Sequence, residues 1–307
     1  MQTDKDLFDL IKETYPISPR EEFVLETADK LKKSARQLNR RSRLKQVTVA
    51  STSIAMCTLA LSGFFFYGGK DTFYNIFSSP QNENTASTAA LKNQAPLVYI
   101  YHSHNQESFV SASESSRNNS DDLFHKEKNI SLVGERLSHA LKSNGIHSIH
   151  DHTNIQEELE GNKRSYSEAY QVSRKPLEDA LGNNKTLKMV LDIHRDTLKR
   201  NQSTIRIDGK DYPKIAFIVS KSSAKYEENF KFAQLLHDYT QEEYPSLSRG
   251  VFTKETPAGS TYNQDLFGNS VLLEVGGKEN TLEEEYRTVD VLSEIISEIL
   301  ADWNELE

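Results

Sequence analysis

The sequence contains only one cysteine, Cys57, among its 307 residues. A single cysteine excludes an intramolecular disulfide and a zinc finger built on cysteines, so a metal site would have to use histidine and carboxylate ligands. The chain also lacks an excess of positive charge, because its formal net charge is -8. We therefore expect no nucleic-acid-binding role for the chain as a whole. The G-x-S-x-G segment that marks one large class of serine hydrolases is missing too.

Charge is absent from one long stretch, residues 46–69, which lies between Lys45 and Lys70. It is longer than the roughly 20 residues that one membrane span needs, so we predict a transmembrane helix there. The alternative is a buried core helix, but the flanking sequence offers little that could surround it. Basic residues without any acidic one run from Lys30 to Lys45. By the positive-inside rule, this places the N-terminus in the cytoplasm and the larger C-terminal part outside the cell membrane.

The composition divides the rest of the chain into three further parts. Residues 1–45 form a short cytoplasmic segment, and residues 70–95 are rich in small polar residues, as is typical of a linker. Residues 96–307 have the alternation of apolar and polar residues expected of a globular, extracytoplasmic domain.

Within that domain, strand-like runs alternate with amphipathic helical patterns. The expected strands are 97–101, 188–193, 205–207, 215–219 and 270–275, and the expected helices are 129–143, 230–244 and a last one that includes 286–299. Asp208 and Gly209 predict a hairpin turn between 205–207 and 215–219. Strands that alternate with helices predict a single α/β domain with a largely parallel sheet flanked by helices.

Polar residues follow or interrupt three of the buried strands. His102 and His104 follow the first strand, His194 ends the second, and Glu274 lies in the last one. In open α/β sheets, functional residues gather at the carboxyl ends of the strands. Two histidines and one glutamate are a ligand set suited to a catalytic zinc ion, Zn²⁺, and a further carboxylate such as Glu274 could carry the proton.

The same segments resemble the stage II sporulation protein P family, which is related to the amidase-3 group of zinc N-acetylmuramoyl-L-alanine amidases. The resemblance covers about residues 96–305. It is carried by three ordered motifs: YHSHNQESF at 101–109, LDIHRD at 191–196, and LEVGG at 273–277 followed by Asn280, Thr281, Glu283 and Glu284.

The resemblance implies a role for each candidate residue. It makes His104, Glu127 and His194 the metal ligands, with His102 as an alternative to His104 and Glu107 as an alternative to Glu127. Glu274 would be the catalytic general base and then general acid. Arg195 would hold a substrate carboxylate or a developing oxyanion, and the alternative for Arg195 is an ion pair with Asp196.

The implied function is hydrolysis of the amide between N-acetylmuramic acid and L-alanine in peptidoglycan. The implied setting is septal wall degradation and engulfment during sporulation, with the sporulation D and M proteins as partners. Two alternatives stay open: a catalytically inactive peptidoglycan-binding scaffold on the same fold, and a zinc peptidase that acts on stem peptides.

Overall fold

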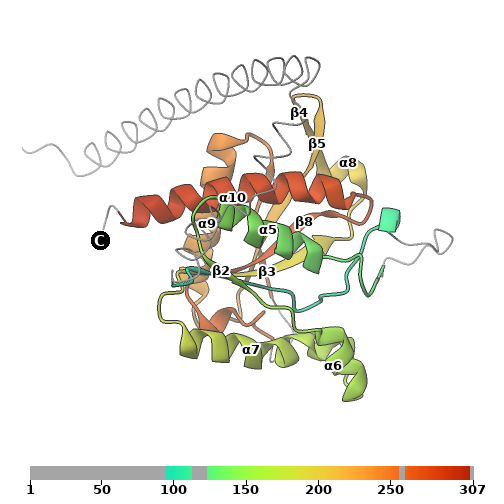
Figure 1. The fold of residues 1–307 in the computed structure, drawn as a ribbon, viewed down its shortest axis with the longest axis vertical. Coiled ribbons are helices and arrows are strands. Elements are labelled where there is room, and N and C mark those ends of the chain that lie inside the picture. The colour runs from blue at the N-terminus through green and yellow to red at the C-terminus, as the bar shows by residue number, and fades with distance from the viewer. Residues whose placement is uncertain (1–94, 113–122, 256–259, 305–307) are drawn as a thin grey trace, which may run out of the picture. The chain divides into compact units, whose positions relative to one another are not determined.

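A six-stranded sheet lies at the centre of the structure, a computed structural model that describes residues 95–112, 123–255 and 260–304 (Figure 1). The strand order is β2-β1-β3-β8-β6-β7, and all neighbours are parallel except β6 and β8, which are antiparallel. The strands are β1 (Val98–Tyr101), β2 (Ser148–His150), β3 (Met189–Asp196), β6 (Ile215–Ser220), β7 (Ser248–Lys254) and β8 (Ser270–Gly277).

Helices cover both faces of this sheet (Figure 1). On one face lie α5 (Ser131–Ser143), α9 (Tyr226–Glu243) and α10 (Leu282–Asn304), and on the other lie α6 (Ile155–Gly161) and α7 (Ala169–Asn183). Four single turns complete the helices: η1 (Val110–Ala112), η2 (Tyr166–Glu168), α8 (Arg200–Ser203) and η3 (Gln264–Leu266). The predicted α/β architecture, with a mostly parallel sheet and flanking helices, is confirmed.

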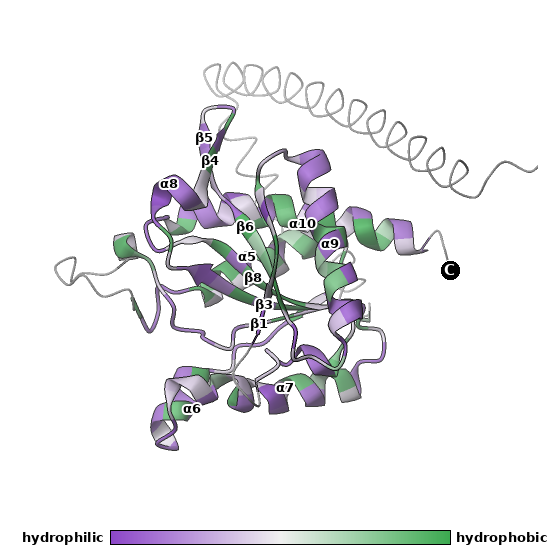
Figure 2. Cartoon of the chain, turned by 180° about the vertical axis from the view of Figure 1, so that it is seen from behind, coloured by the Kyte–Doolittle hydropathy of each residue, from purple (hydrophilic) through white to green (hydrophobic). Residues whose placement is uncertain are grey.

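Side chains along β3 alternate between the larger hydrophobic core and the opposite face of the sheet, where the candidate functional residues lie. Leu191 and Ile193 are fully buried in the larger core, beneath α5, α9 and α10. Val190 packs into the smaller cluster on the opposite face. Because successive side chains of a strand point to opposite faces, Asp192 and His194 lie on the same face as Val190. Figure 2 shows helices that alternate between polar and apolar residues, as expected of helices with one face on the core.

The predicted hairpin is present, but its second strand was assigned wrongly. Asp208 and Gly209 both have positive φ, at 47° and 78°, and connect β4 (Thr204–Ile207) to β5 (Lys210–Pro213) in a small antiparallel sheet. Residues 215–219 belong instead to β6 in the main sheet. A two-residue turn of this kind joins strands directly, so the short polar run 210–213 takes the place that the sequence analysis gave to the more apolar run.

Three predicted parts of the chain lie wholly or almost wholly outside the described residues: the segment 1–45, the span 46–69 and the linker 70–95. They stay predictions. In the described ranges 95–112, 123–255 and 260–304, no helix combines the length and the apolar character that crossing a membrane requires.

Gly134 in α5 allows two histidine rings to pack directly against the helix. Nδ1 of His102 lies 2.9 Å from the carbonyl oxygen of Ile193, and its Nε2 lies 3.0 Å from Nε2 of His150. A Cβ atom at position 134 would lie 2.3 Å from Nε2 of His102 and 2.8 Å from Nε2 of His150. The glycine therefore leaves room for both rings, one of which follows β1 while the other ends β2.

We predict that Gly134→Ala destabilises the full-length chain by about 1–3 kcal/mol, because the buried rings would have to move to admit the methyl group. Gly182→Ala in α7 is the matched control, since a Cβ there meets nothing within 4 Å. The control should be neutral or stabilising by up to about 1 kcal/mol, through helix propensity. Chemical denaturation of both variants measures the difference, and equal stabilities would contradict this packing.

Candidate active site

The carboxylate of Asp192 organises the candidate site from the middle of β3. Asp192 is 2% exposed and accepts hydrogen bonds from the backbone N–H of Ser103, at 2.9 Å, and from the Ser103 hydroxyl, at 2.7 Å. Its Oδ1 also lies 3.0 Å from Nε2 of His194. Burial opposes ionisation, but the charge of His194 and these hydrogen bonds outweigh it and lower the pKa of Asp192. The ionised group fixes both the turn after β1 and the imidazole ring.

His194 lies between two carboxylates. Its Nε2 faces Asp192, and its Nδ1 lies 3.3 Å from Oε2 of Glu107. Burial favours the neutral ring, but the charges of Asp192 and Glu107 outweigh it and raise the pKa of His194 to about 10. The pKa of Glu107 is correspondingly lowered, although its own burial opposes this. The ring is therefore oriented at both nitrogens.

His104 lies beside His194, with 5.4 Å between the ring centroids. Its Nδ1 is buried and has no hydrogen-bond partner in the described part of the chain. Burial and the neighbouring charge of His194 lower the pKa of His104 to about 4, so this imidazole is neutral at pH 7. A neutral imidazole with an unused, buried nitrogen is available as a ligand.

The alternative histidine, His102, has no nitrogen to spare. Because the carbonyl oxygen of Ile193 can only accept, Nδ1 of His102 donates to it, and Nε2 is engaged with His150. Burial lowers the pKa of His102 to about 4. The structure therefore favours His104 over His102 as a ligand.

The glutamate that contacts His194 is Glu107 and not Glu127. Oε2 of Glu107 also accepts the backbone N–H of Arg195, at 3.2 Å. Glu127 is exposed, and its backbone N–H donates to Nδ1 of His125 at 3.0 Å, in the turn that precedes α5. The ligand role of Glu127 stays an untested prediction, but its placement does not support it. The structure brings the alternative, Glu107, to the site.

Glu274 lies opposite His194 in the parallel pairing of β3 and β8. Its Oε1 accepts a hydrogen bond from Nζ of Lys254, at 3.1 Å. Burial and the charge of Asp196 raise the pKa of Glu274, and Lys254 only partly opposes them. Asp196 stays ionised, because Glu274 and Arg249, at 2.6 Å, stabilise its charge against burial. A carboxyl group with a raised pKa is suited to accepting and delivering a proton near neutral pH.

Arg195 is 5% exposed and holds the loop that follows β1. Its Nε donates to the carbonyl oxygen of Ser108, at 2.7 Å, and its Nη2 donates to that of Leu123, at 3.1 Å. These contacts point to a structural role. The predicted contact of Arg195 with a substrate carboxylate or an oxyanion stays a prediction.

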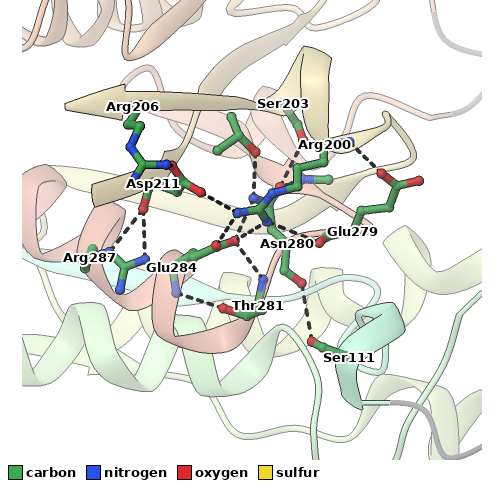
Figure 3. A network of polar contacts seen from close by, with 12 residues as sticks. Ser111, Arg200, Ser203, Arg206, Asp211, Glu279, Asn280, Thr281, Glu284 and Arg287 are labelled. Atoms are coloured by element: carbon green, nitrogen blue, oxygen red, sulfur yellow. Dashed lines mark hydrogen bonds and ion pairs between the residues drawn. The ribbon is translucent and has the colours of Figure 1, made fainter. Parts of the chain in front are cut away.

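The polar residues of the third motif form a network that joins the ends of β3 and β8 (Figure 3). Oδ1 of Asn280 accepts from the backbone N–H of Gly277 and from the hydroxyl of Ser203, both at 2.9 Å. Arg200 donates to Glu284 at the start of α10 and, at 2.7 Å, to Asp211 of β5. These residues are scaffold: they hold the segments that follow the two strands carrying His194 and Glu274.

The donor set at this site suits zinc. As the side chains stand, no three His, Cys, Asp or Glu residues of the described ranges are grouped to hold a metal ion. The contact of His194 with Glu107 is, however, one that a cation can replace, because a proton on Nδ1 of His194 faces the carboxylate there. The orphaned Nδ1 of His104 adds a second nitrogen. A carboxylate behind the opposite nitrogen of a histidine, as Asp192 is, is the usual support of a zinc ligand.

Sequence reasoning missed the two aspartates, Asp192 and Asp196. The signal for Asp192 was present, because a carboxylate inside an otherwise apolar strand is costly unless it is hydrogen-bonded. The signal for Asp196 was weaker. Its partners, Arg249 on β7 and Glu274 on β8, lie near it only because of the order of the strands in the sheet, which the sequence does not reveal.

Fold and geometry thus define an α/β protein with a histidine–carboxylate site at the carboxyl ends of its central parallel strands. A model of the family "Stage II sporulation protein P (SpoIIP)" matches residues 20–297, and the chain belongs to this family. Stage II sporulation protein P of Bacillus subtilis (strain 168) is 40% identical over 207 residues, which are 67% of this chain and 51% of that protein. The chain thus spans about half the length of this curated relative.

Two solved structures are also similar. The CwlD amidase from Clostridioides difficile, in complex with the GerS lipoprotein, has a TM-score of 0.44 and 14% identity, over 69% of this chain and 100% of that one. An N-acetylmuramoyl-L-alanine amidase from Clostridium difficile 630 has a TM-score of 0.39 and 10% identity, over 69% of this chain and 98% of that one.

The raised pKa of His194 predicts how the stability of the metal-free chain depends on pH. The stabilisation by Asp192 and Glu107 is complete below the unfolded pKa of 6.5 and is lost as pH rises toward about 10. The destabilisation caused by Asp192→Asn should therefore shrink between pH 6.5 and 10.

Urea unfolding of the full-length chain in the presence of a chelator measures this difference. Asp290→Asn is the control, because Asp290 forms an exposed pair with Arg136 and has no histidine partner. A destabilisation by Asp192→Asn that is the same at all these pH values would contradict the ionic arrangement.

Proposed function

We propose that this chain is a zinc-dependent N-acetylmuramoyl-L-alanine amidase that hydrolyses peptidoglycan during sporulation. The observation that carries the proposal is the placement of His194. Asp192 holds its Nε2, while its Nδ1 faces Glu107 and its ring lies beside the unused Nδ1 of His104. Family membership supports the peptidoglycan substrate and the sporulation setting.

His104, Glu107 and His194 would hold the zinc ion, which leaves a fourth position open. A bound zinc ion supplies a water molecule of lowered pKa and polarises the carbonyl group of the scissile amide. Asp192 keeps His194 in one orientation throughout. Because its pKa is raised, Glu274 is suited to take the proton of the attacking water and to pass it to the amino group of the departing L-alanine.

The first test is the metal content and the reaction of the purified full-length chain. Elemental analysis should find about one zinc ion per chain, and digestion of purified peptidoglycan should release stem peptides that begin with L-alanine. Removal of the metal by a chelator should abolish this release, and zinc should restore it. Metal-free protein that leaves the wall intact would support the scaffold alternative, and fragments cut within the stem peptide would support the peptidase alternative.

The second test separates the two candidate glutamates. Glu107→Ala should lose zinc and activity together, since it removes one of the three proposed ligands. Glu127→Ala should keep both, because Glu127 is exposed in the turn before α5. Glu274→Gln should keep zinc but lower kcat at least about 100-fold, in the range of a lost general acid or base. Zinc loss in Glu127→Ala with retention in Glu107→Ala would reverse the ligand assignment.

A further inference from the structure

Four aromatic rings and the candidate ligand His104 form a continuous line of ring contacts. Phe124 contacts Tyr166 with 5.6 Å between centroids, and Tyr166 stacks on His104 at 4.0 Å and 24°. On its other side His104 meets Tyr170 at 5.3 Å, and Tyr170 meets Tyr262 at 5.0 Å. Packing around a candidate metal ligand explains the inner part of this line, but not the part that reaches the surface.

The outer end of the line is exposed. Phe124 and Tyr166 each leave 44% of their surface accessible, which makes them the most exposed large apolar side chains of the described residues. Their ring planes meet at 65°, so the exposed parts of the two rings face in different directions. An isolated exposed aromatic residue needs no explanation, but two that touch each other and abut a candidate active site point to a ligand.

The surroundings of Phe124 and Tyr166 are polar. The hydroxyl of Tyr166 lies 3.5 Å from Oε1 of Glu107. Phe124 is followed by three exposed charged residues, Lys126, Glu127 and Lys128, and η2 is preceded by the exposed Lys163 and Arg164. A stable protein partner would need about 800 Å² on each side, with a more apolar centre than two rings among charges provide.

A sugar ring has the matching chemistry. Its axial C–H groups form an apolar face that packs on an aromatic ring by dispersion, and its hydroxyl groups lie around the edge, where polar side chains can bind them. Of a peptide and a glycan, the two components of peptidoglycan, the glycan is the one that presents such rings.

We propose that Phe124 and Tyr166 form a subsite that binds a sugar ring of the glycan strand next to the scissile amide. The inference rests on the proposed amidase function, because it assigns the exposed rings to the substrate of that site. The subsite places a sugar beside His104 and makes the glycan, in addition to the stem peptide, a determinant of substrate recognition.

The test is binding of peptide-free glycan oligosaccharides, with alternating N-acetylglucosamine and N-acetylmuramic acid, to the full-length chain. Phe124→Ala and Tyr166→Ala should each weaken binding about tenfold, which is the effect of losing about 1.4 kcal/mol. Tyr166→Phe should largely retain binding, since it keeps the ring. Phe252→Ala is the matched control, because Phe252 is similarly exposed, at 40%, but lies far from His104. It belongs to the edge strand β7, and β3, β8 and β6 separate β7 from β1, the strand that leads to His104.

Two further readouts separate this inference from the proposed function. On intact peptidoglycan, Phe124→Ala should raise KM about tenfold while kcat and zinc content stay unchanged. Wild-type chain that cuts the wall but does not bind peptide-free glycan, or alanine variants that bind it as the wild type does, would overturn the subsite. A wild-type chain without zinc or cleavage would refute the amidase, whatever the glycan measurement gives.

Discussion

The buried charge of Asp192 is the constraint on which the candidate site depends. An ionised carboxylate inside a strand is tolerated only when hydrogen bonds and an opposite charge compensate its lost hydration. Here Ser103 supplies two hydrogen bonds and His194 supplies the charge. One side chain therefore joins the end of β1 to β3 and orients the imidazole. If it were removed, the turn that carries His104 would lose two hydrogen bonds, and the ring of His194 would lose one of its two carboxylate partners.

The parallel order of β1, β3 and β8 turns this local arrangement into a site. The three strands end at the same edge, so the loop after β1 brings Glu107 to His194, and the pairing of β3 with β8 brings Glu274 opposite it. The two environments shift the carboxylates in opposite directions: the pKa of Asp192 is lowered beside His194, and the pKa of Glu274 is raised beside Asp196. Such a separation lets one carboxylate hold charge while the other carries a proton.

The sequence predicted the larger part of this architecture, because periodicity and strand-end polarity are local signals. It identified the strands that carry His104, His194 and Glu274 and the parallel sheet that joins them. Asp192 was not predicted from the sequence. Glu127 was predicted as the metal ligand in preference to Glu107, because a glutamate at the start of a helix resembles the ligand of related amidases. That choice depends on how the loop after β1 folds back, which Arg195 determines through the carbonyl groups of Ser108 and Leu123. The line of aromatic rings likewise joins four regions that are distant in sequence, at 104, 124, 166–170 and 262, so spacing could not predict it.

The most direct test of this account is anomalous X-ray diffraction, at the zinc edge, from crystals of the zinc-loaded chain. The arrangement described here predicts one zinc ion bound by Nδ1 of His104, Nδ1 of His194 and the carboxylate of Glu107, with Asp192 still bonded to Nε2 of His194. Zinc on Nε2 of His194, zinc bound by Glu127, or no anomalous peak near these side chains would contradict it.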